Sequence, residues 1–501
     1  PRRPAAGLTQ KQRKETLRKE AVSFLFCTGG VTQDELLLPP CTKHASARKG
    51  RKNPPLLRAD IFPRQTVDFS RRSAYTVRLG GTRRPLIKRF TGALFHMDYY
   101  LLTDLAATMG YHLAMSGAET FRVEDTVHRI LGAYGIECEV FAIPNSISVS
   151  LEAANGKPLM VLRRIGFHGN DLEKLEKLNA LSRRICAEKP APDEAFRWLR
   201  ETLDDCRTYR TGVYYLGNIL AGMGFCIVFG GALRDCLWAG LIGLIIGLVS
   251  RFMDSREANP FFSTMLASCL MALPAYAAAG LGLLERPNAA IIGALMILVP
   301  GLLITNSMRD IIYGDTNSGM FRIVQVVLMA MAIALGTAAA WRLTAGIYGQ
   351  TVSSTVSWPA LAQAAAVFIG CSGFCILFNV HGRGMLLADI GGMLSWMVYL
   401  LCTALGCDVY AANLFAAVFA ALYSETMARV RKCPAVNYLV ISTLPMLPGA
   451  GVYYTMSLGL EGRMMDSVAK GLETVGVAGS LAVGILLVST VFRLFSHRGK
   501  K

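Results

Sequence analysis

The hydrophobic pattern of this sequence changes at about Tyr209. From there onward, apolar runs recur with only short polar breaks, and most have the roughly 18–24 residues that a helix needs to cross a bilayer. The ten runs lie at about 213–231, 236–250, 261–283, 288–306, 321–341, 358–379, 384–404, 409–427, 436–458 and 474–493. One such run is also typical of a buried core helix, but ten in succession indicate a polytopic α-helical membrane protein with about ten transmembrane helices.

Residues 97–208 have the mixed pattern of a small soluble α+β domain. Amphipathic periodicity predicts helices at about 98–115, 121–134, 170–187 and 193–208, and alternating residues predict strands at 136–143, 146–152 and 158–165. Ser116-Gly117-Ala118-Glu119 fits a capping box, in which Ser116 and Glu119 cap the second helix. Charged residues gather at this helix start, but the chain has no GxSxG, HExxH or GxxxxGK[ST] motif. We therefore favour gating, sensing or assembly over catalysis for this domain.

Residues 1–96 differ from both of these parts. They contribute +15 of the formal net charge of +17 and contain no Met, although the chain has 21. Their Arg/Lys runs and Pro pairs show no sustained periodicity, which is typical of disorder. We interpret them as translated upstream sequence before a natural start at Met97, and the alternative is a genuine basic cytoplasmic tail. Because the rest of the chain is nearly neutral, its charge gives no reason to expect a nucleic-acid partner.

The loops between the apolar runs carry an uneven charge. On the side of residues 97–208, the loops, Arg493 and the basic tail at 495–501 hold 14 Lys and Arg, whereas the opposite side holds 5. This bias predicts that both termini are cytoplasmic. The thirteen cysteines show no CxxC pair or zinc spacing, so we expect neither a disulfide framework nor a metal site.

The membrane half contains an internal repeat. Gly224-Phe225-Cys226-Ile227-Val228-Phe229 returns at 373–378 with an offset of 149, and Val299-Pro300-Gly301 returns as Leu447-Pro448-Gly449 with an offset of 148. Each unit holds five helices, so the modules 209–345 and 355–494 have opposite orientations. Such inverted repeats are typical of secondary transporters, which bind substrate near mid-membrane. The Pro-Gly pairs predict that helices four and nine break, and broken helices expose termini that can hold polar ligand groups.

Polar residues inside the apolar runs mark a candidate pathway, because such groups are costly in lipid. We select Asn218, Pro300, Gly301, Thr305, Asn306, Arg309, Asp310, Asn379, Arg383, Pro448 and Gly449. Arg309 and Asp310 could instead form an interfacial ion pair with each other. Asp389 and Glu425 are the candidates for proton carriage, because a carboxyl in apolar surroundings resists ionisation.

Several of these motifs resemble the threonine/serine exporter family. The resemblance rests on 116–124 (SGAETFRVE), which includes Ser116, Gly117, Glu119, Arg122 and Glu124, and on Asn170-Asp171-Leu172, Pro300-Gly301 with Arg309-Asp310, Phe378-Asn379-Val380 and 445–449 (PMLPG). It covers about 98–493 and implies both modules of that family fused in one chain. The second Pro-Gly pair is followed by Ala450–Tyr454, with no counterpart of Arg309-Asp310, so we do not expect the two halves to contribute equal sites.

The resemblance implies export of threonine and serine across the bacterial cytoplasmic (inner) membrane, driven by the membrane gradient and needing no cofactor. Our leading hypothesis is a secondary exporter of small polar amino acids, coupled to protons. The second is a dicarboxylate exporter, because separate-chain relatives are linked to succinate efflux. Unpaired Arg309 and Arg383 in the cavity would favour a dianion, and Asp310 or Asp389 there would favour a zwitterion. The remaining alternatives are a membrane enzyme and a sensor or assembly partner. The expected partners are the small polar metabolite, the lipid bilayer and, as an open possibility, a second copy of the chain.

Overall fold

The structure is a computed structural model, and it describes residues 98–153, 156–166, 169–348 and 356–498. These described residues form one compact unit. The predictions for residues 1–96 and for the end of the basic tail at 499–501 lie outside the described residues.

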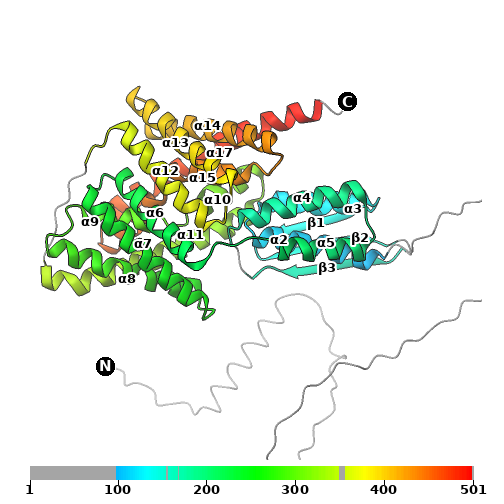
Figure 1. Cartoon of the computed structure of the whole chain (residues 1–501), viewed down its shortest axis with the longest axis horizontal. Helices are drawn as coiled ribbons and strands as arrows, with labels where there is room; N and C mark the ends of the chain where they lie inside the picture. Colours follow the sequence, from blue (N-terminus) through cyan, green and yellow to red (C-terminus); the bar gives the residue numbers. More distant parts are fainter. Residues whose placement is uncertain (1–97, 154–155, 167–168, 349–355, 499–501) are drawn as a thin grey trace, which may run out of the picture. The chain divides into compact units, whose positions relative to one another are not determined.

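The first described part combines a small antiparallel sheet with four helices (Figure 1). Its elements are α2 (Tyr99–Met115), α3 (Thr120–Ala133), β1 (Cys138–Ile143), β2 (Ser146–Glu152), β3 (Pro158–Arg164), α4 (Leu172–Glu188) and α5 (Pro192–Asp204). The strand order is β1-β2-β3, with both neighbouring pairs antiparallel. On β2, Ile147, Val149 and Leu151 are buried, and they join one hydrophobic cluster with residues of all four helices. The alternation along β2 therefore gives the sheet one face that packs against the helices.

Helix α3 begins later than the capping-box prediction requires. Its N-cap is Glu119, whose side chain makes no capping hydrogen bond. Ser116 instead ends α2, and its hydroxyl donates to the carbonyl of His112 at 2.8 Å. The prediction of reciprocal capping by Ser116 and Glu119 is therefore wrong, because the chain turns at Gly117 (φ +91°) and enters the next helix one turn later. The Glu119 carboxylate is consequently left for another partner.

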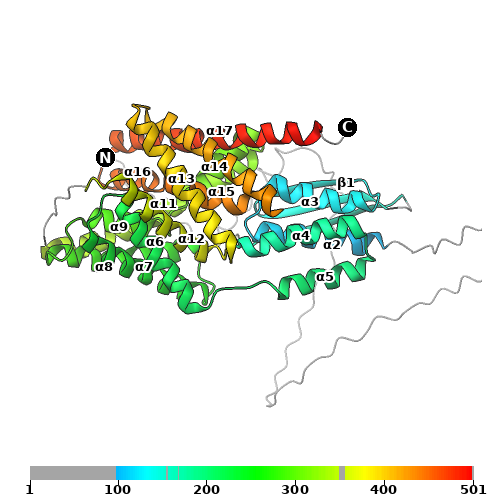
Figure 2. The ribbon, with the colours of Figure 1, turned by 45° about the horizontal axis from the view of Figure 1, so that its top comes forward.

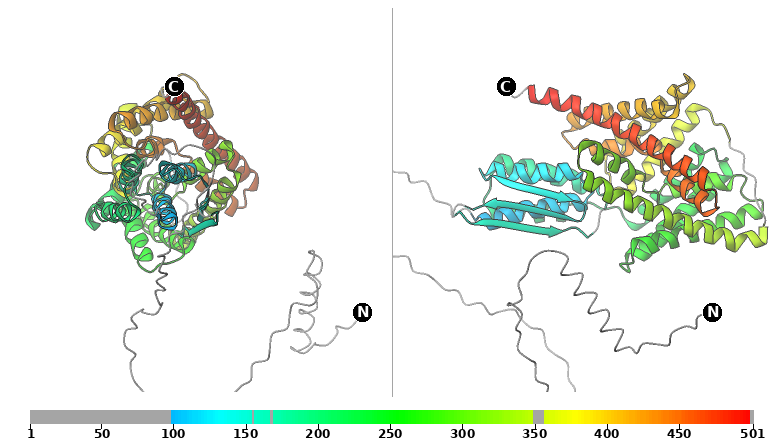
Figure 3. Two further views of the ribbon diagram at one scale, coloured as in Figure 1. Left: turned by 90° about the vertical axis from the view of Figure 1, so that its right-hand side faces the viewer. Right: turned by 180° about the vertical axis from the view of Figure 1, so that it is seen from behind.

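Among the described residues after α5, eight helices are long and apolar enough to cross a membrane. They are α6 (Thr211–Val228), α7 (Leu233–Asp254), α8 (Pro260–Gly280), α11 (Thr316–Tyr348), α12 (Ala360–Leu377), α13 (Arg383–Ala404), α14 (Val409–Arg431) and α17 (Met464–Arg498, red in Figure 3). The chain is therefore a polytopic, mostly helical membrane protein.

The other two predicted spans are each interrupted at their Pro-Gly pair. The fourth run gives α9 (Pro287–Leu295) and α10 (Gly301–Tyr313), with Pro300 as the N-cap of α10. The ninth gives α15 (Val436–Thr443), the short 3₁₀ helix η1 (Leu444–Met446) and α16 (Gly449–Leu460), with Pro448 as the N-cap of α16 (Figure 2). The predicted breaks in helices four and nine are confirmed, and among the described residues eight helices are long and apolar enough to cross a membrane.

Residues related by the repeat contact each other reciprocally where α6 crosses α12. A Cβ added at Gly224 would overlap the backbone of Gly370 and Ala366. With an offset of 149, the matching Gly373 faces the backbone of the matching residues Ala221 and Gly217. Phe225 and Phe374, also a matched pair, meet edge to face with ring centroids 5.6 Å apart. The two helices therefore pack closely around a local two-fold relation.

The same relation extends to the other helices of the two modules. The contacts of α6 with α7, α7 with α8, α8 with α11 and α10 with α11 have counterparts in α12 with α13, α13 with α14, α14 with α17 and α16 with α17. Between the modules, α10 packs against α17, and α16 packs against α11. Each half-helix after a Pro-Gly break thus lies against the last helix of both modules.

Replacing Gly224 by Ala should destabilise the protein, because the added methyl group overlaps the backbone of α12. We expect a loss of about 1–3 kcal/mol, typical of overpacking, and the same for Gly373→Ala. Gly212→Ala is the matched control, since it lies in α6 with open space around it. Thermal unfolding of the purified protein in detergent should show lower melting temperatures only for the first two variants. Equal melting temperatures for all three would contradict this packing.

Candidate functional site

A cavity of about 240 Å³ lies where the part of the chain formed by α2–α5 and the sheet, called the soluble part below, meets both membrane modules. We call it the α10 cavity. Its walls come from the start of α3, the end of α10, the end of α14, the start of α15 and the C-terminal part of α17. The charged residues that line it are Glu119, Arg122, Arg309, Asp310, Asp315, Glu425 and Arg429. The structure therefore brings together candidates from the soluble motif, from the residues after Pro300 and from α14.

The α10 cavity is crossed by an ion pair between the soluble part and the first module. Arg309 Nη2 lies 2.9 Å from Glu119 Oε1, and their side chains are only 11% and 23% exposed. This is the carboxylate that makes no capping hydrogen bond at the start of α3. Beside the pair, the rings of Phe121 and Tyr313 meet with centroids 5.5 Å apart. Glu119 and Phe121 therefore dock α3 on the end of α10.

Two of the other three acids of the cavity, Asp310 and Glu425, also have arginine partners. Asp310 Oδ2 lies 3.0 Å from Arg322 Nε, an ion pair without hydrogen-bond alignment, with both side chains at most 15% exposed. Glu425 Oε2 accepts a hydrogen bond from Arg429 Nη1 at 2.6 Å. Arg309 and Asp310 thus pair with different residues and not with each other. The prediction that Glu425 lies in apolar surroundings is wrong, because its arginine neighbour one turn later faces the same cavity.

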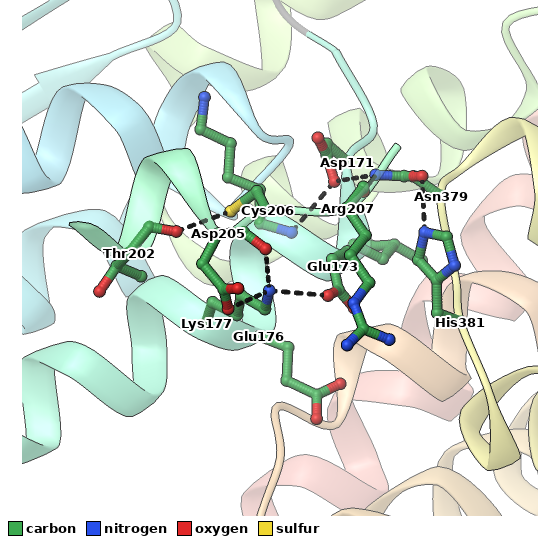
Figure 4. Close-up of polar contacts among 12 residues, drawn as sticks. Asp171, Glu173, Glu176, Lys177, Thr202, Asp205, Cys206, Arg207, Asn379 and His381 are labelled. Atoms are coloured by element: carbon green, nitrogen blue, oxygen red, sulfur yellow. Dashed lines mark hydrogen bonds and ion pairs between the residues drawn. The ribbon is translucent and has the colours of Figure 1, made fainter. Parts of the chain in front are cut away.

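The soluble part also docks on the second module, through Asp171 and Asn379 (Figure 4). Asn379 Nδ2 donates to Asp171 Oδ1 at 3.1 Å and to the carbonyl of Arg207 at 2.6 Å, while His381 Nε2 lies 2.9 Å from Asn379 Oδ1. Asn379 can reach all three because its backbone is left-handed (φ +59°) just after α12 ends. Leu172 N also donates to the carbonyl of Phe378 at 3.0 Å.

The two docking contacts arise from segments that are hydrogen-bonded to each other. Gly169 N donates to the carbonyl of Met115 at 2.9 Å, and Asp171 N donates to that of Ser116 at 3.2 Å. Gly117 lies directly against the second segment, because a Cβ added at Gly117 would lie 2.7 Å from the Gly169 carbonyl oxygen. The Ser116–Glu119 turn and the segment before α4 therefore act as one unit that contacts both modules.

A second cavity, of about 800 Å³, lies between α8, α9, α11 and α16. We call it the α16 cavity. Its lining includes Tyr276, Asn288, Ile291, Thr337, Trp341, Tyr453, Ser457, Leu458 and Glu461. With the repeat offsets of 148 and 149, most of these positions match lining residues of the α10 cavity. On α16, Ser457, Leu458 and Glu461 match Arg309, Asp310 and Tyr313 of α10. The other matched pairs are Tyr276 with Glu425, Asn288 with Val436, Ile291 with Leu439, Thr337 with Ile485 and Trp341 with Ser489. The two cavities are built from equivalent parts of the two modules.

The two Pro-Gly breaks lie against each other. A Cβ at Gly301 would lie 3.0 Å from Leu447 Cβ, and a Cβ at Gly449 would lie 2.9 Å from Val299 Cγ1. These contacts are also reciprocal, since Leu447 matches Val299 and Gly449 matches Gly301. Next to them, a small apolar cluster includes two further matched pairs, Ile304 with Val452 and Ala330 with Ala478. On each of the four helices, the cluster residue precedes the cavity-lining residues.

Other candidates lie away from both cavities. Asn218 is buried against α7, where its backbone and side chain fill the space at Gly243 and Gly247. Asp389 is 1% exposed and accepts hydrogen bonds from Ser372 Oγ (2.7 Å) and Cys375 Sγ (3.2 Å). The remaining four that line neither cavity are Thr305, Asn306, Arg383 and Glu124. Arg383 is exposed, and Glu124 accepts from Ala142 N at 2.8 Å, with its pKa raised by burial.

Sequence reasoning missed Arg429 and most of the α16 cavity. The spacing of Glu425 and Arg429 on one helix face could have indicated their pairing. Applying the repeat offset to Arg309 and Asp310 would have pointed to Ser457 and Leu458. Among the described residues, no group of three or more His, Cys, Asp or Glu side chains could hold a metal ion.

Two family models match the sequence. One, described as "Putative threonine/serine exporter", matches residues 104–344, and the other, "Threonine/Serine exporter, ThrE", matches residues 363–491. The chain belongs to the threonine/serine exporter family. Both modules of the family are present in one polypeptide, as the sequence motifs predicted. The matches cover the two cavities and the soluble elements that reach the α10 cavity.

Individual relatives are distant but extensive. A "Probable threonine/serine exporter" of Mycobacterium tuberculosis is 22% identical over 83% of this chain and 82% of its own length, and a "Threonine/serine exporter" of Corynebacterium glutamicum is 24% identical over 79% and 84%. A "Probable succinate transporter subunit YjjP" of Klebsiella aerogenes is 21% identical over 47% of this chain and 91% of its own length. No solved structure matches the chain.

Reversing Glu119 or Arg309 alone, with Glu119→Arg or Arg309→Glu, should lower the melting temperature. Each change places two like charges in a largely buried contact. The double reversal should recover most of the loss, giving a coupling energy of about 1–3 kcal/mol in a double-mutant cycle.

Asp125 and Arg129 provide the matched control, because they form an ion pair of 2.8 Å on the same helix whose side chains are 38% and 69% exposed. Reversal of that pair should couple by less than about 0.5 kcal/mol. A coupling at Glu119 and Arg309 no larger than this control would show that α3 is not docked through the pair.

Proposed function

We propose that this member of the family is a secondary exporter of small polar amino acids of the threonine and serine type. The observation that carries the proposal is the balance of charge in the α10 cavity. Four acids and three arginines line it, and Arg309 is already paired with Glu119. A zwitterion needs a cation for its carboxylate and an acid for its ammonium. An arginine and an acid that are already paired with each other can provide both, because each can leave its protein partner and pair with one charge of the substrate.

A dicarboxylate such as succinate is the second candidate, supported by the name of the Klebsiella relative. A dianion would favour a cavity with surplus, unpaired cations. The lining of the α10 cavity has one acid more than it has arginines, and Arg383 lies outside it. Asp310 is in the cavity, which was the sequence criterion for a zwitterion. The charges therefore favour the amino acid.

In the transport cycle that we propose, the two matched cavities open alternately. The modules act as inverted repeats of five membrane-crossing elements each, counting the broken helices. The reciprocal contacts at α6 and α12 and at the Pro-Gly breaks support this, as does the matched lining of the cavities. In this arrangement both termini and residues 97–208 are cytoplasmic, the α10 cavity faces the cytoplasm, and the α16 cavity faces outward. Substrate passes when the Pro-Gly contact between them loosens.

The soluble part acts as the cytoplasmic gate. It supplies Glu119, Phe121 and Arg122 to the α10 cavity, so the cavity is incomplete without it. Its contact with the second module includes several hydrogen bonds around Asp171 and Asn379, and its contact with α10 includes the ion pair of Glu119 and Arg309 and the ring contact of Phe121 and Tyr313. In this proposal the gate opens on the α10 side, which lets the amino acid enter beside Arg309.

Of the two candidate proton carriers, we assign the role to Asp389 and not to Glu425. Asp389 is buried between α12 and α13, with a hydroxyl and a thiol as its hydrogen-bond donors. A carboxylate so placed is costly unless it is protonated in part of the cycle. Its neighbours Gly391 and Gly392 pack against Ser442 and Ile441 of α15, directly before the second Pro-Gly break. A change of charge at Asp389 can therefore be transmitted to that break.

Purified protein in proteoliposomes should exchange radiolabelled threonine and serine in counterflow. Labelled succinate should exchange at least about tenfold more slowly, because the lining of the α10 cavity has no surplus cation. Empty liposomes set the background. Exchange of succinate without exchange of threonine would replace the proposal by the dicarboxylate alternative.

Asp389→Asn should abolish export driven by a proton gradient while leaving threonine counterflow near the wild-type rate. The amide keeps the shape and hydrogen bonding of the carboxyl but does not ionise. Asp235→Asn is the control, because Asp235 is equally buried but accepts three backbone N–H groups of Ala232, Glu285 and Arg286. Its change should reduce both activities and the melting temperature together. Full driven export in Asp389→Asn would exclude it as the proton carrier.

A further inference from the structure

The α16 cavity contains a cluster of hydroxyl groups at its centre. The side chain of Tyr453 interacts with those of Thr337, Ser457 and Tyr276. Tyr276 also meets Trp341 edge to face, with ring centroids 5.4 Å apart. These side chains come from α8 and α11 of the first module and from α16 of the second, so the cluster joins the two modules directly.

Three matched positions are charged in the α10 cavity and neutral in the α16 cavity, whereas Glu461 is charged and its counterpart Tyr313 is neutral. Arg309 corresponds to Ser457, Asp310 to Leu458 and Glu425 to Tyr276. Every one of these replacements removes a charge and leaves a neutral group. The scaffold is therefore repeated, but the chemistry of the lining is not.

The charged residues that line the α16 cavity are Arg342, Glu461 and Arg463, and all three are exposed. Arg463 pairs with Glu461 at 3.9 Å and with Asp466 at 2.8 Å, and all three side chains are 56–58% exposed. The paired side chains in the α10 cavity at Glu119, Arg309 and Asp310 are 11–23% exposed. Charge–charge attraction is much weaker at exposed sites, where water screens it.

We propose that the α16 cavity is a low-affinity release site for the exported amino acid. This inference rests on the proposed function and adds where and how the substrate leaves. The site holds a small zwitterion with a hydroxyl side chain by neutral hydroxyl and ring groups, without buried partners for its two charges. A charge in a desolvated site without a partner is unfavourable, so the zwitterion returns readily to water. The difference in affinity between the two cavities does not drive net export, because only the gradient can do so. It raises the external concentration of the amino acid that is needed for the carrier to bind it again from outside.

Transplanting the charged pair tests the assignment. Ser457→Arg combined with Leu458→Asp reproduces in α16 the Arg309-Asp310 pair of α10. The concentration of external threonine that half-saturates exchange in right-side-out vesicles should fall about tenfold or more, while the value for internal threonine in inside-out vesicles stays within about twofold. Ser457→Gln combined with Leu458→Asn is the neutral control, which adds comparable bulk without charge and should not lower the external half-saturating concentration. An unchanged external value, or equal changes on both sides, would overturn the release site.

A milder variant covers the case in which the transplanted charges prevent folding. Ser457→Cys should react with a membrane-impermeant thiol reagent added outside, above the background of the wild type, and threonine should slow the reaction. Protection should need at least about ten times more threonine than half-saturates internal exchange. Normal threonine exchange without any protection at Ser457→Cys would overturn the release site alone. Absence of threonine exchange in the wild type would overturn the proposed function and this inference with it.

Discussion

The contact between the two Pro-Gly breaks is the constraint on which the rest of the membrane part depends. Proline has no backbone N–H and stands as the N-cap of each second half-helix, and glycine lets that half-helix begin with its backbone close to a neighbour. Gly301 lies against Leu447, and Gly449 lies against Val299, so each break occupies the space that the other leaves. The half-helices after the breaks, α10 and α16, then lead away to separate cavities. One local feature, present twice, thus gives two sites separated by a thin apolar contact.

The soluble part adds an element that the repeat does not contain. Its segment around Gly117 and Gly169 contacts the first module through Glu119 and the second through Asp171, and backbone hydrogen bonds connect the two contacts. A movement of one module relative to the other therefore changes at least one of them. This explains in physical terms why a motif in the soluble part is linked to polar residues in both membrane modules. It also makes the α10 cavity different from the α16 cavity, although most of their lining positions match.

The sequence alone predicted the elements well where periodicity and helix-breaking residues decide them. The apolar runs and the Pro-Gly breaks follow directly from composition and local stereochemistry. The partners of charged residues could not be predicted, because they come from distant segments. Arg309 pairs with Glu119, 190 positions earlier in the sequence, and not with its neighbour Asp310. Glu425 looked apolar in context because its helix is apolar, but Arg429 lies one turn further along it. The capping box failed for a related reason, since Gly117 allowed a turn that the four-residue pattern does not encode.

The central claim is that one substrate route opens alternately at two matched cavities. Ser489 and Trp341 are matched positions on α17 and α11 that line the α10 and α16 cavities, respectively. The most direct measurement is the thiol-labelling rate of Ser489→Cys and Trp341→Cys, each compared with and without the Arg309→Glu change that breaks the gate. The account predicts reciprocal rates: breaking the gate should speed labelling at Ser489→Cys and slow it at Trp341→Cys. Faster labelling at both positions, or no change at Trp341→Cys while Ser489→Cys responds, would contradict it.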